Sequence, residues 1–522
     1  MSQIYTPTVK FRIAAVFSDH MVLQRDKPIR IFGEGVDGTC VRVCLERPDG
    51  AAVEEQTVAK KGKWMAILPP QEASVGCTLT ITAGCGNSAE MRAFSDVAIG
   101  EVWLAGGQSN MEFELQSCKG GLESLKNDIK PAVRFYQVPR NAYKTQEFYA
   151  AEEASSWQLF DPEESRTWSA VGYYFAKKLS EDLGGVTVGV IGCSLGGTSA
   201  SAWVSRESLL EDGDLSCYVT EFDQECAGLP IQEQERLYDK YLAFHTLWDK
   251  QCAALYRENP QIEWAQVQEI LGPCRYPGPK SCKSPFRPGG LYECMLRRII
   301  PYTLAGCIFY QGESDDHKPE LYRTLLTKLI ELWRQDFMDL ELPFIFTQLT
   351  MHRYRQDPDF GNWPIIRQAQ QQVYETVPHT GMAVIVDKGE FDNIHPLDKK
   401  PVGERLALQA LAHLYGKISI AQASGPCFRC AYRQGDMVKV EFDYAADGLI
   451  ASNGTPTGFE IAGEEGVFRP VSARIDGKSI LLKAPEATFI RYLWSNYAEV
   501  NLFGKNGLPA APFAAKITVS TF

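Results

Sequence analysis

The stretch Val102-Trp103-Leu104-Ala105-Gly106-Gly107-Gln108-Ser109-Asn110-Met111 decides how the rest of the chain is interpreted. An apolar run typical of a buried strand ends in two glycines, and a serine follows after a single glutamine. Glycine permits positive φ and close backbone approach, so the Ser109 hydroxyl is expected to stand exposed at the end of a sheet. A helix over 110–115 would point its first N–H groups towards that serine. The stretch predicts a candidate nucleophile, although a Gly-Ser turn also fits the same residues.

Composition limits the classes of protein to which the chain can belong. Its 522 residues are too many for one compact core, so several domains are expected. A net charge of −12 argues against nucleic acid or an anionic membrane as a partner, and no apolar run is long enough to span a bilayer. The first ten residues lack the features of a signal peptide, and 15 scattered cysteines are typical of reduced thiols. We therefore expect a cytoplasmic protein.

The hydrophobic pattern predicts three domains. Residues 1–96 read as short strands separated by Gly and Asp turns, typical of a small β-sandwich, and residues 418–522 read as a second β domain. Residues 97–417 alternate strands with helices, which predicts a parallel sheet wrapped by helices. A polar segment at about 205–285, helical around Gln232–Tyr256, is expected to be an insertion. The strands expected in the α/β domain are Val97–Ala105, Val186–Ile191, Leu304–Tyr310, Phe344–Leu349 and Met382–Asp387, and the helices are Trp168–Leu183, Leu321–Phe337 and Val402–Leu414.

Chemically useful groups follow four of these five strands. In an open parallel sheet, ligands bind beyond the carboxyl ends of the strands. The residues found there are Ser109 after the first strand, Gly196 and Gly197 after the second, Gln311 after the third and His395 after the fifth. Turn chemistry alone does not account for glycine, amide and imidazole groups at the same edge. The sequence therefore predicts a site at this edge of the sheet.

These groups meet the needs of acyl transfer. A serine hydroxyl needs an adjacent base, and His395 can take the proton of Ser109 and return it to a leaving alcohol. Asp392 precedes His395 by three residues and can orient the imidazole. No metal and no cofactor are expected. The candidate donors of an oxyanion hole are the backbone N–H groups of Ser109, Gly196 and Gly197 and the side-chain amide of Gln311.

Three other motifs suggest different chemistry. Gly192-Cys193-Ser194-Leu195-Gly196 matches the G-x-S-x-G nucleophile elbow, but the residues after it are a poor opening for a helix, so Ser194 ranks below Ser109. Cys427-Phe428-Arg429-Cys430 is a lone C-x-x-C and weak evidence for zinc or redox function. Asp315-Asp316-His317 resembles part of a metal site, but we expect the neighbouring Glu313 to brace its loop instead.

Motifs from end to end of the chain resemble one family. They match, in order, the motifs of the sialate O-acetylesterase family of SGNH-type, GDSL-like esterases. The segments that carry the resemblance are Phe17-Ser18-Asp19-His20-Met21-Val22-Leu23-Gln24-Arg25, Gly107-Gln108-Ser109-Asn110-Met111, Gly196-Gly197-Thr198 with Trp203, Pro288-Gly289-Gly290-Leu291-Tyr292, Tyr310-Gln311-Gly312-Glu313-Ser314, Ile394-His395-Pro396 with Lys399, Val402-Gly403-Glu404-Arg405-Leu406-Ala407, and Gly507-Leu508-Pro509-Ala510 with Pro512-Phe513.

The resemblance implies a flavodoxin-like SGNH core and hydrolysis of acetyl esters on a sugar, typically sialic acid, through an acetyl-serine without a cofactor. It implies Ser109 as nucleophile, His395 as base and Gln311 with the Gly196/Gly197 loop as oxyanion hole. Some relatives carry the acid at the position of Asn393 rather than that of Asp392. Expected supporting residues are Gln108, Asn110 and Glu313, and expected substrate contacts are Trp203, Arg353 and Arg355.

Two other functions stay open at this point. A polysaccharide acetylesterase acting on a polymer such as xylan would use the same triad. A carbohydrate-binding protein with a catalytically dead α/β domain is the alternative from another class. The complete set of nucleophile, base and oxyanion donors favours an enzyme, and the expected partner is a small acetylated sugar.

Overall fold

The computed structural model describes residues 11–84, 89–259, 262 and 264–519, which form two compact units. Residues 139–153 and 201–297 make up the first unit, and the second contains residues 11–138, 154–200 and 298–519. The first ten residues, from which the cellular location was predicted, and the last three residues of the predicted C-terminal β domain lie outside the described residues. None of the described helices has the length and apolar character needed to span a membrane.

One long strand joins two sheet regions of the second unit. Strand β8 (Glu90–Gly107) pairs antiparallel with β7 (Ser74–Ala83) through its first half and parallel with β11 (Val188–Ser194) through its second half. It therefore crosses residue 96, the predicted end of the first domain, without a break, and that boundary stays a prediction. The other strands before it are β1 (Phe11–Ile13), β2 (Val22–Gln24), β3 (Ile29–Gly35), β4 (Cys40–Glu46), β5 (Ala52–Val58) and β6 (Lys63–Leu68).

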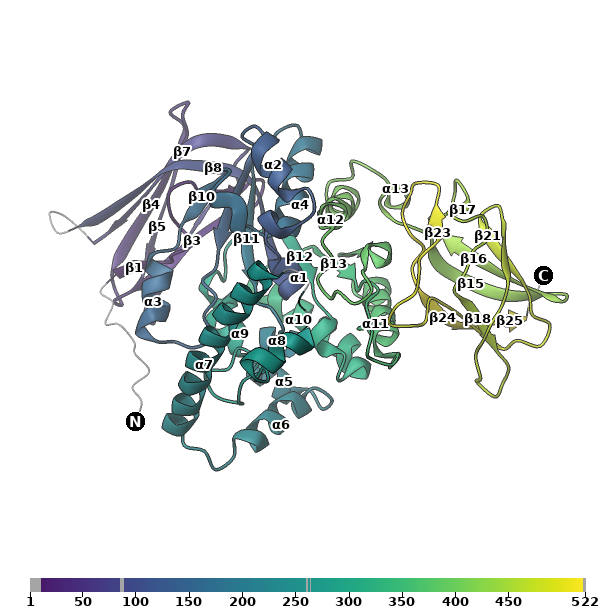
Figure 1. Ribbon diagram of the computed structural model, residues 1–522. Coiled ribbons are helices and arrows are strands. Elements are labelled where there is room, and N and C mark those ends of the chain that lie inside the picture. The colour runs from purple at the N-terminus through teal and green to yellow at the C-terminus, as the bar shows by residue number, and fades with distance from the viewer. Residues whose placement is uncertain (1–10, 85–88, 260–261, 263, 520–522) are drawn as a thin grey trace. The chain divides into compact units, whose positions relative to one another are not determined.

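The second half of β8 lies at the centre of a sheet with the order β10-β9-β11-β8-β12-β13-β14 (Figure 1). All neighbours in this series are parallel except β10 and β9, so the five strands expected from the sequence are present in a parallel sheet. Strand β9 was not predicted, because Val-Arg-Phe-Tyr-Gln has polar residues inside a short run. The remaining bounds are β9 (Val133–Gln137), β10 (Trp157–Leu159), β12 (Gly306–Tyr310), β13 (Phe344–Gln348) and β14 (Thr380–Val384).

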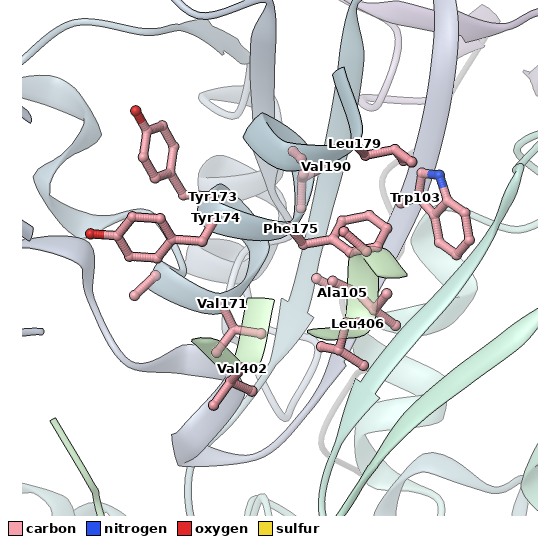
Figure 2. Packing of buried hydrophobic residues seen from close by; sticks show 14 of the residues in the cluster. Trp103, Ala105, Val171, Tyr173, Tyr174, Phe175, Leu179, Val190, Val402 and Leu406 are labelled. Carbon is pink, nitrogen blue, oxygen red and sulfur yellow. The ribbon is translucent and has the colours of Figure 1, made fainter. Parts of the chain in front are cut away.

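Helices α4 (Ala170–Asp182) and α12 (Lys400–His413) pack together against the central strands (Figure 2). Phe175 meets Trp103 of β8 edge to face, with ring centroids 4.9 Å apart, and Leu406 lies in the same cluster. A Cβ at Gly403 would lie 2.6 Å from the Val171 carbonyl, so the glycine permits the close approach of the two helices. Two further helices of this unit are α10 (Tyr322–Asp336) and α11 (Asn362–Thr376), and the three predicted helices are confirmed.

The chain after α12 and the short α13 (Ile420–Ala423) forms strands in two larger sheets and one pair, drawn yellow-green in Figure 1. Cys427 and Cys430 lie in β15 on either side of a bulge. In the described part of the chain, no three His, Cys, Asp or Glu side chains are placed to hold a metal ion. The strands are β15 (Cys427–Gln434), β16 (Met437–Asp443), β17 (Leu449–Ala451), β18 (Phe459–Ala462), β19 (Arg469–Pro470), β20 (Ala473–Asp476), β21 (Ser479–Lys483), β22 (Phe489–Tyr492), β23 (Leu502–Gly504), β24 (Phe513–Lys516) and β25 (Thr518–Val519).

The first unit is helical. Its longest helix, α7 (Ile231–Glu258), confirms the helix predicted around Gln232–Tyr256. The segment expected as an insertion, about 205–285, falls within the 201–297 part of this unit. The other helices of the unit are α3 (Gln146–Glu153), α5 (Arg206–Glu211), α6 (Ser216–Cys226), α8 (Trp264–Leu271) and α9 (Gly290–Cys294).

The end of β8 touches β12 so closely that no side chain fits between them. Gly107 has φ +137°, and a Cβ there would lie 2.1 Å from the carbonyl oxygen of Tyr310. The backbone N–H of Gln108 donates to that same carbonyl at 3.2 Å. The double glycine therefore fixes the corner from which Ser109 projects.

Replacing Gly107 by alanine is expected to destabilise the protein by more than about 2 kcal/mol, because strain at positive φ adds to the clash with Tyr310. The matched control is Gly38→Ala, where φ is +88° but an added Cβ meets nothing within 4 Å. That control is expected to cost only about 1 kcal/mol. Thermal unfolding of the two variants measures the difference, and equal destabilisation would contradict the role assigned to the corner.

Candidate active site

The structure brings Ser109 and His395 together from positions 286 residues apart. Ser109 opens α1 (Ser109–Glu112), directly after the corner at the end of β8. His395 lies on the loop between β14 and α12, and its Nε2 is 2.8 Å from Ser109 Oγ. Helix α1 is shorter than expected, because it ends at Glu112 instead of continuing to residue 115. The contact is the one that a serine nucleophile and its general base require.

A buried polar network connects the serine turn to the histidine loop. The Asn110 Nδ2 group donates to the Ile394 carbonyl at 3.0 Å and to Glu313 Oε1 at 2.5 Å. Lys399 Nζ donates to Asn110 Oδ1 at 2.5 Å. Asn110 thus binds the backbone immediately before His395 and holds the base beside the nucleophile.

Burial and nearby positive charge favour the neutral form of His395. Burial lowers the pKa of this histidine, and the Lys399 charge lowers it further, followed by a smaller contribution from His352. Burial also lowers the pKa of Lys399 to about 8, against the opposing effects of Glu313 and Glu390. Near neutral pH, Lys399 is therefore still largely protonated while His395 is free to accept a proton.

Gln108 and Gln311 belong to a second buried network at the end of β12. Gln311 Nε2 donates to Gln108 Oε1 at 3.2 Å, to the Thr198 carbonyl at 3.3 Å and to the Asp315 carboxylate. The Tyr322 hydroxyl donates to Gln311 Oε1 at 2.8 Å. The amide of Gln311 is therefore fully used within the protein, and its role as an oxyanion donor, which stays a prediction, requires one of these bonds to be exchanged.

Gly196 lies directly beside the nucleophile, as expected for a residue of an oxyanion hole. A Cβ at Gly196 would lie 3.3 Å from Ser109 Cβ. Its backbone N–H, however, donates to Glu112 Oε2 at 2.6 Å. Gly197 follows with φ +71° and turns the loop away. Substrate has to displace the Glu112 carboxylate before the Gly196 amide can bind an oxyanion.

The structure does not bring Asp392 to His395, contrary to the expectation from their spacing. Asp392 has φ +66°, and its carboxylate accepts the backbone N–H of Arg355 at 2.9 Å and lies 3.5 Å from Arg355 Nε. Among the residues described, no hydrogen bond joins Asp392 to His395. The His395 backbone N–H instead donates to Asn393 Oδ1 at 3.1 Å. The physical reason is the left-handed turn at Asp392, which directs the carboxylate to the preceding loop. The predicted role as triad acid is therefore left to a test by substitution.

The three predicted substrate contacts have different surroundings. Arg355 is exposed and adjacent to Asp392, as described above. The Arg353 guanidinium lies 5.6 Å from the ring of Phe391, and its backbone carbonyl accepts the Asp392 N–H. Both arginines therefore reach the histidine loop. Trp203 belongs to the first unit and is fully buried, and its role as a substrate contact stays a prediction.

The rival nucleophile has no such surroundings. Ser194 is the last residue of β11, opposite Gly107 in the parallel ladder, and only 2% of it is exposed. Its strand does not lead into a helix directly, because a turn and the short helix at Ala200–Trp203 follow it. The geometry therefore favours Ser109.

The sequence analysis assigned no role to two charged residues that the structure places beside the candidate site. Glu112 was not singled out, although it lies one helical turn after Ser109 and that spacing is a usable signal. Lys399 was noted only as part of a motif, without a chemical role. Its amino group lies 4.8 Å from the centre of the Phe113 ring and binds Asn110, and these contacts depend on long-range packing that the local sequence does not show.

Comparisons with known proteins show which proteins this chain is similar to. A family model described as carbohydrate esterase, sialic acid-specific acetylesterase, matches residues 99–218 and 273–412. Sialate O-acetylesterase of Mus musculus is 26% identical over 564 residues, covering 98% of this chain and 95% of the mouse protein. The Homo sapiens sialate O-acetylesterase is 26% identical over 436 residues, covering 78% of this chain and 72% of the human one. A novel carbohydrate acetylesterase from Xanthomonas citri, known from its crystal structure, is 26% identical with a TM-score of 0.74, over 98% of this chain and 100% of that one.

Together, the fold and these matches define the class: the protein is a carboxylic ester hydrolase, a carbohydrate esterase. Within that class, the chain belongs to the family of sialic acid-specific acetylesterases.

The surroundings of His395 predict the pH dependence of the activity. A general base acts when neutral, and a lowered pKa keeps His395 neutral to lower pH. The midpoint of the acidic limb of the kcat/KM profile should therefore lie below the ordinary histidine pKa of about 6.5. Lys399→Met removes a charge that lowers this pKa and should move the limb to higher pH. The measurement is the pH profile with p-nitrophenyl acetate. Lys400→Met, which changes the exposed neighbour, should leave the limb in place; a limb that Lys399→Met does not shift would contradict the assignment.

Substitution of Asp392 tests the orientation of the base. Because its carboxylate is bound to Arg355, Asp392→Asn is expected to retain kcat/KM within about tenfold, whereas losing an orienting triad carboxylate costs about 10⁴ in a serine protease. His395→Ala provides the reference for full loss of the base. A loss in Asp392→Asn close to that reference would show that Asp392 reaches His395 during catalysis.

Proposed function

We propose that the protein removes O-acetyl groups from O-acetylated sialic acid through an acetyl-Ser109 intermediate. The observation that carries the proposal is the 2.8 Å contact between Ser109 and His395 at the end of a parallel sheet, in a chain that belongs to a family of acetylesterases. The names of the mouse and human relatives support sialic acid as the sugar.

The proposed reaction has two halves. His395 Nε2 takes the Ser109 proton as Oγ attacks the acetyl carbonyl carbon, and the resulting imidazolium then protonates the leaving sugar oxygen. Water, deprotonated by His395, attacks the acetyl-serine and releases acetate, which restores the Ser109 hydroxyl. The oxyanion formed in each half would bind the backbone N–H groups of Ser109 and Gly196 once Glu112 has moved, with Gly197 and Gln311 as the other candidate donors.

The proposed architecture is a flavodoxin-like SGNH core at residues 97–417, flanked by β domains at 1–96 and 418–522. The order of the parallel strands and the placement of Ser109 after the first of them support it. The sialic acid carboxylate would bind Arg353 or Arg355, since guanidinium groups form paired bonds with carboxylates and both lie by the histidine loop. A cytoplasmic location, predicted from the sequence, would favour a free sugar over a polymer.

Acetylated polysaccharide is the second candidate substrate. The likeness to the carbohydrate acetylesterase of Xanthomonas citri covers 98% of this chain and supports sugar deacetylation without specifying sialic acid. The same Ser109–His395 pair would serve either substrate. A relative that only binds carbohydrate is disfavoured because the pair is in hydrogen-bonding contact.

Acetate release by the wild type, Ser109→Ala and Ser194→Ala tests the proposal. Ser109→Ala is expected to lose at least about 10³-fold in kcat on p-nitrophenyl acetate and on 9-O-acetylated sialic acid, as a nucleophile does. Ser194→Ala is the matched control and should stay active. Loss confined to Ser194→Ala would overturn the site, and wild-type activity on acetylated xylan but not on the sialic acid would replace the substrate.

A further inference from the structure

A cavity of about 610 Å³ lies in the second unit, and neither Ser109 nor His395 lines it. One wall is the loop Asp359–Gly361 before α11, and the others come from β18, β19, β22 and the segment after β22. The volume is within the range of pockets that hold a small ligand. None of its lining residues belongs to the catalytic networks described above.

The wall after β22 is held rigidly from behind. Arg367 of α11 is fully buried, and its guanidinium donates to the carbonyls of Ser495 and Asn496, both at 2.9 Å. The Asp359 carboxylate accepts the Asn496 N–H with both oxygens, at 3.1 and 3.0 Å. Leu493, which also lines the cavity, has φ +51°, an unfavourable conformation for a branched residue. A strained wall fixed by buried bonds is typical of a preformed binding site.

The cavity offers aromatic surface together with a fixed donor–acceptor pair. Phe360 is 68% exposed, and Trp494 is partly exposed at the same cavity. Arg491 Nε donates to Glu460 Oε2 at 2.7 Å, and the Arg491 guanidinium stacks at 4.0 Å on the ring of Phe468. That arrangement fixes the plane of the guanidinium and places charged donors next to a carboxylate acceptor.

The charges of the lining disfavour an acidic ligand. Asp359 and Glu460 contribute two carboxylates and Arg491 one guanidinium, so the lining has a net charge of −1. A ligand carboxylate would have to compete with Glu460 for Arg491. A neutral pyranose instead has C–H faces for aromatic rings and neighbouring hydroxyls that both donate and accept hydrogen bonds.

We propose that this cavity binds a neutral pyranose sugar, with Phe360 and Trp494 against the face of the ring and the Arg491–Glu460 pair on neighbouring hydroxyls. It would be a second carbohydrate site, separate from the site of ester hydrolysis. Because it does not depend on catalysis, it can be tested even if the proposed esterase function fails.

Binding to the wild type is measured by saturation-transfer NMR and titration calorimetry with methyl β-D-galactopyranoside, methyl β-D-glucopyranoside, methyl α-D-mannopyranoside and, as the acidic probe, N-acetylneuraminic acid. At least one neutral glycoside is expected to bind. Phe360→Ala and Trp494→Ala should each weaken it about five- to tenfold, the effect of losing one aromatic contact. Tyr256→Ala, at an exposed tyrosine of α7, is the matched control and should bind as the wild type does.

Two further variants separate the alternatives. Glu460→Gln should weaken binding of the neutral glycoside. The Phe360→Ala variant introduced above should leave kcat/KM for p-nitrophenyl acetate unchanged. Tighter binding of N-acetylneuraminic acid in Glu460→Gln, lost again in Arg491→Ala, would make the cavity an anion site and overturn the proposal. No binding of any neutral glycoside, or binding that the two aromatic substitutions do not affect, would also overturn it.

Discussion

The contact between the end of β8 and the carbonyl of Tyr310 is the constraint on which the site depends. Only a residue without Cβ fits there, since an added Cβ at Gly107 would lie 2.1 Å from that oxygen. The next residue, Gln108, donates its N–H to the same carbonyl and accepts bonds from Gln311 and Ser314. The loops after β8 and β12 are thereby locked together, and Ser109 is presented in a fixed direction before any substrate arrives.

A buried cation then couples this corner to the base. Lys399 donates to Asn110, and Asn110 donates to the Ile394 carbonyl directly before His395. A series of hydrogen bonds therefore links the serine turn to the histidine loop. Glu313 offsets the lysine charge, and burial raises the pKa of its carboxyl. Burial lowers the pKa of His395 most, and the Lys399 charge lowers it further. The bonds that hold this charge in place belong to the same network that positions His395.

Much of the fold was predictable because buried strands and helices have a regular pattern of apolar residues in the sequence. Apolar runs predicted five parallel strands, and the residues after them predicted that Ser109 and His395 would meet. The orientation of Asp392 was not predictable from its spacing, since a left-handed turn and a bond to Arg355 decide it. Strand β9 was missed because Arg134 interrupts its apolar run, and in the structure that side chain is buried on the carbonyls of His20 and Asp96.

Glu112 connects the helix that carries Ser109 with the loop that carries Gly196. Its carboxylate oxygen lies 2.6 Å from the Gly196 N–H, the group expected to bind the oxyanion. The acceptor is a carboxyl oxygen, so the Gly196 N–H is oriented towards an oxygen acceptor beside Ser109. Glu112 is only half-buried, so a displaced carboxylate regains water and its departure costs less than that of a buried charge. The Gly196 amide therefore already binds an oxygen acceptor next to Ser109, which fits its predicted role as an oxyanion donor.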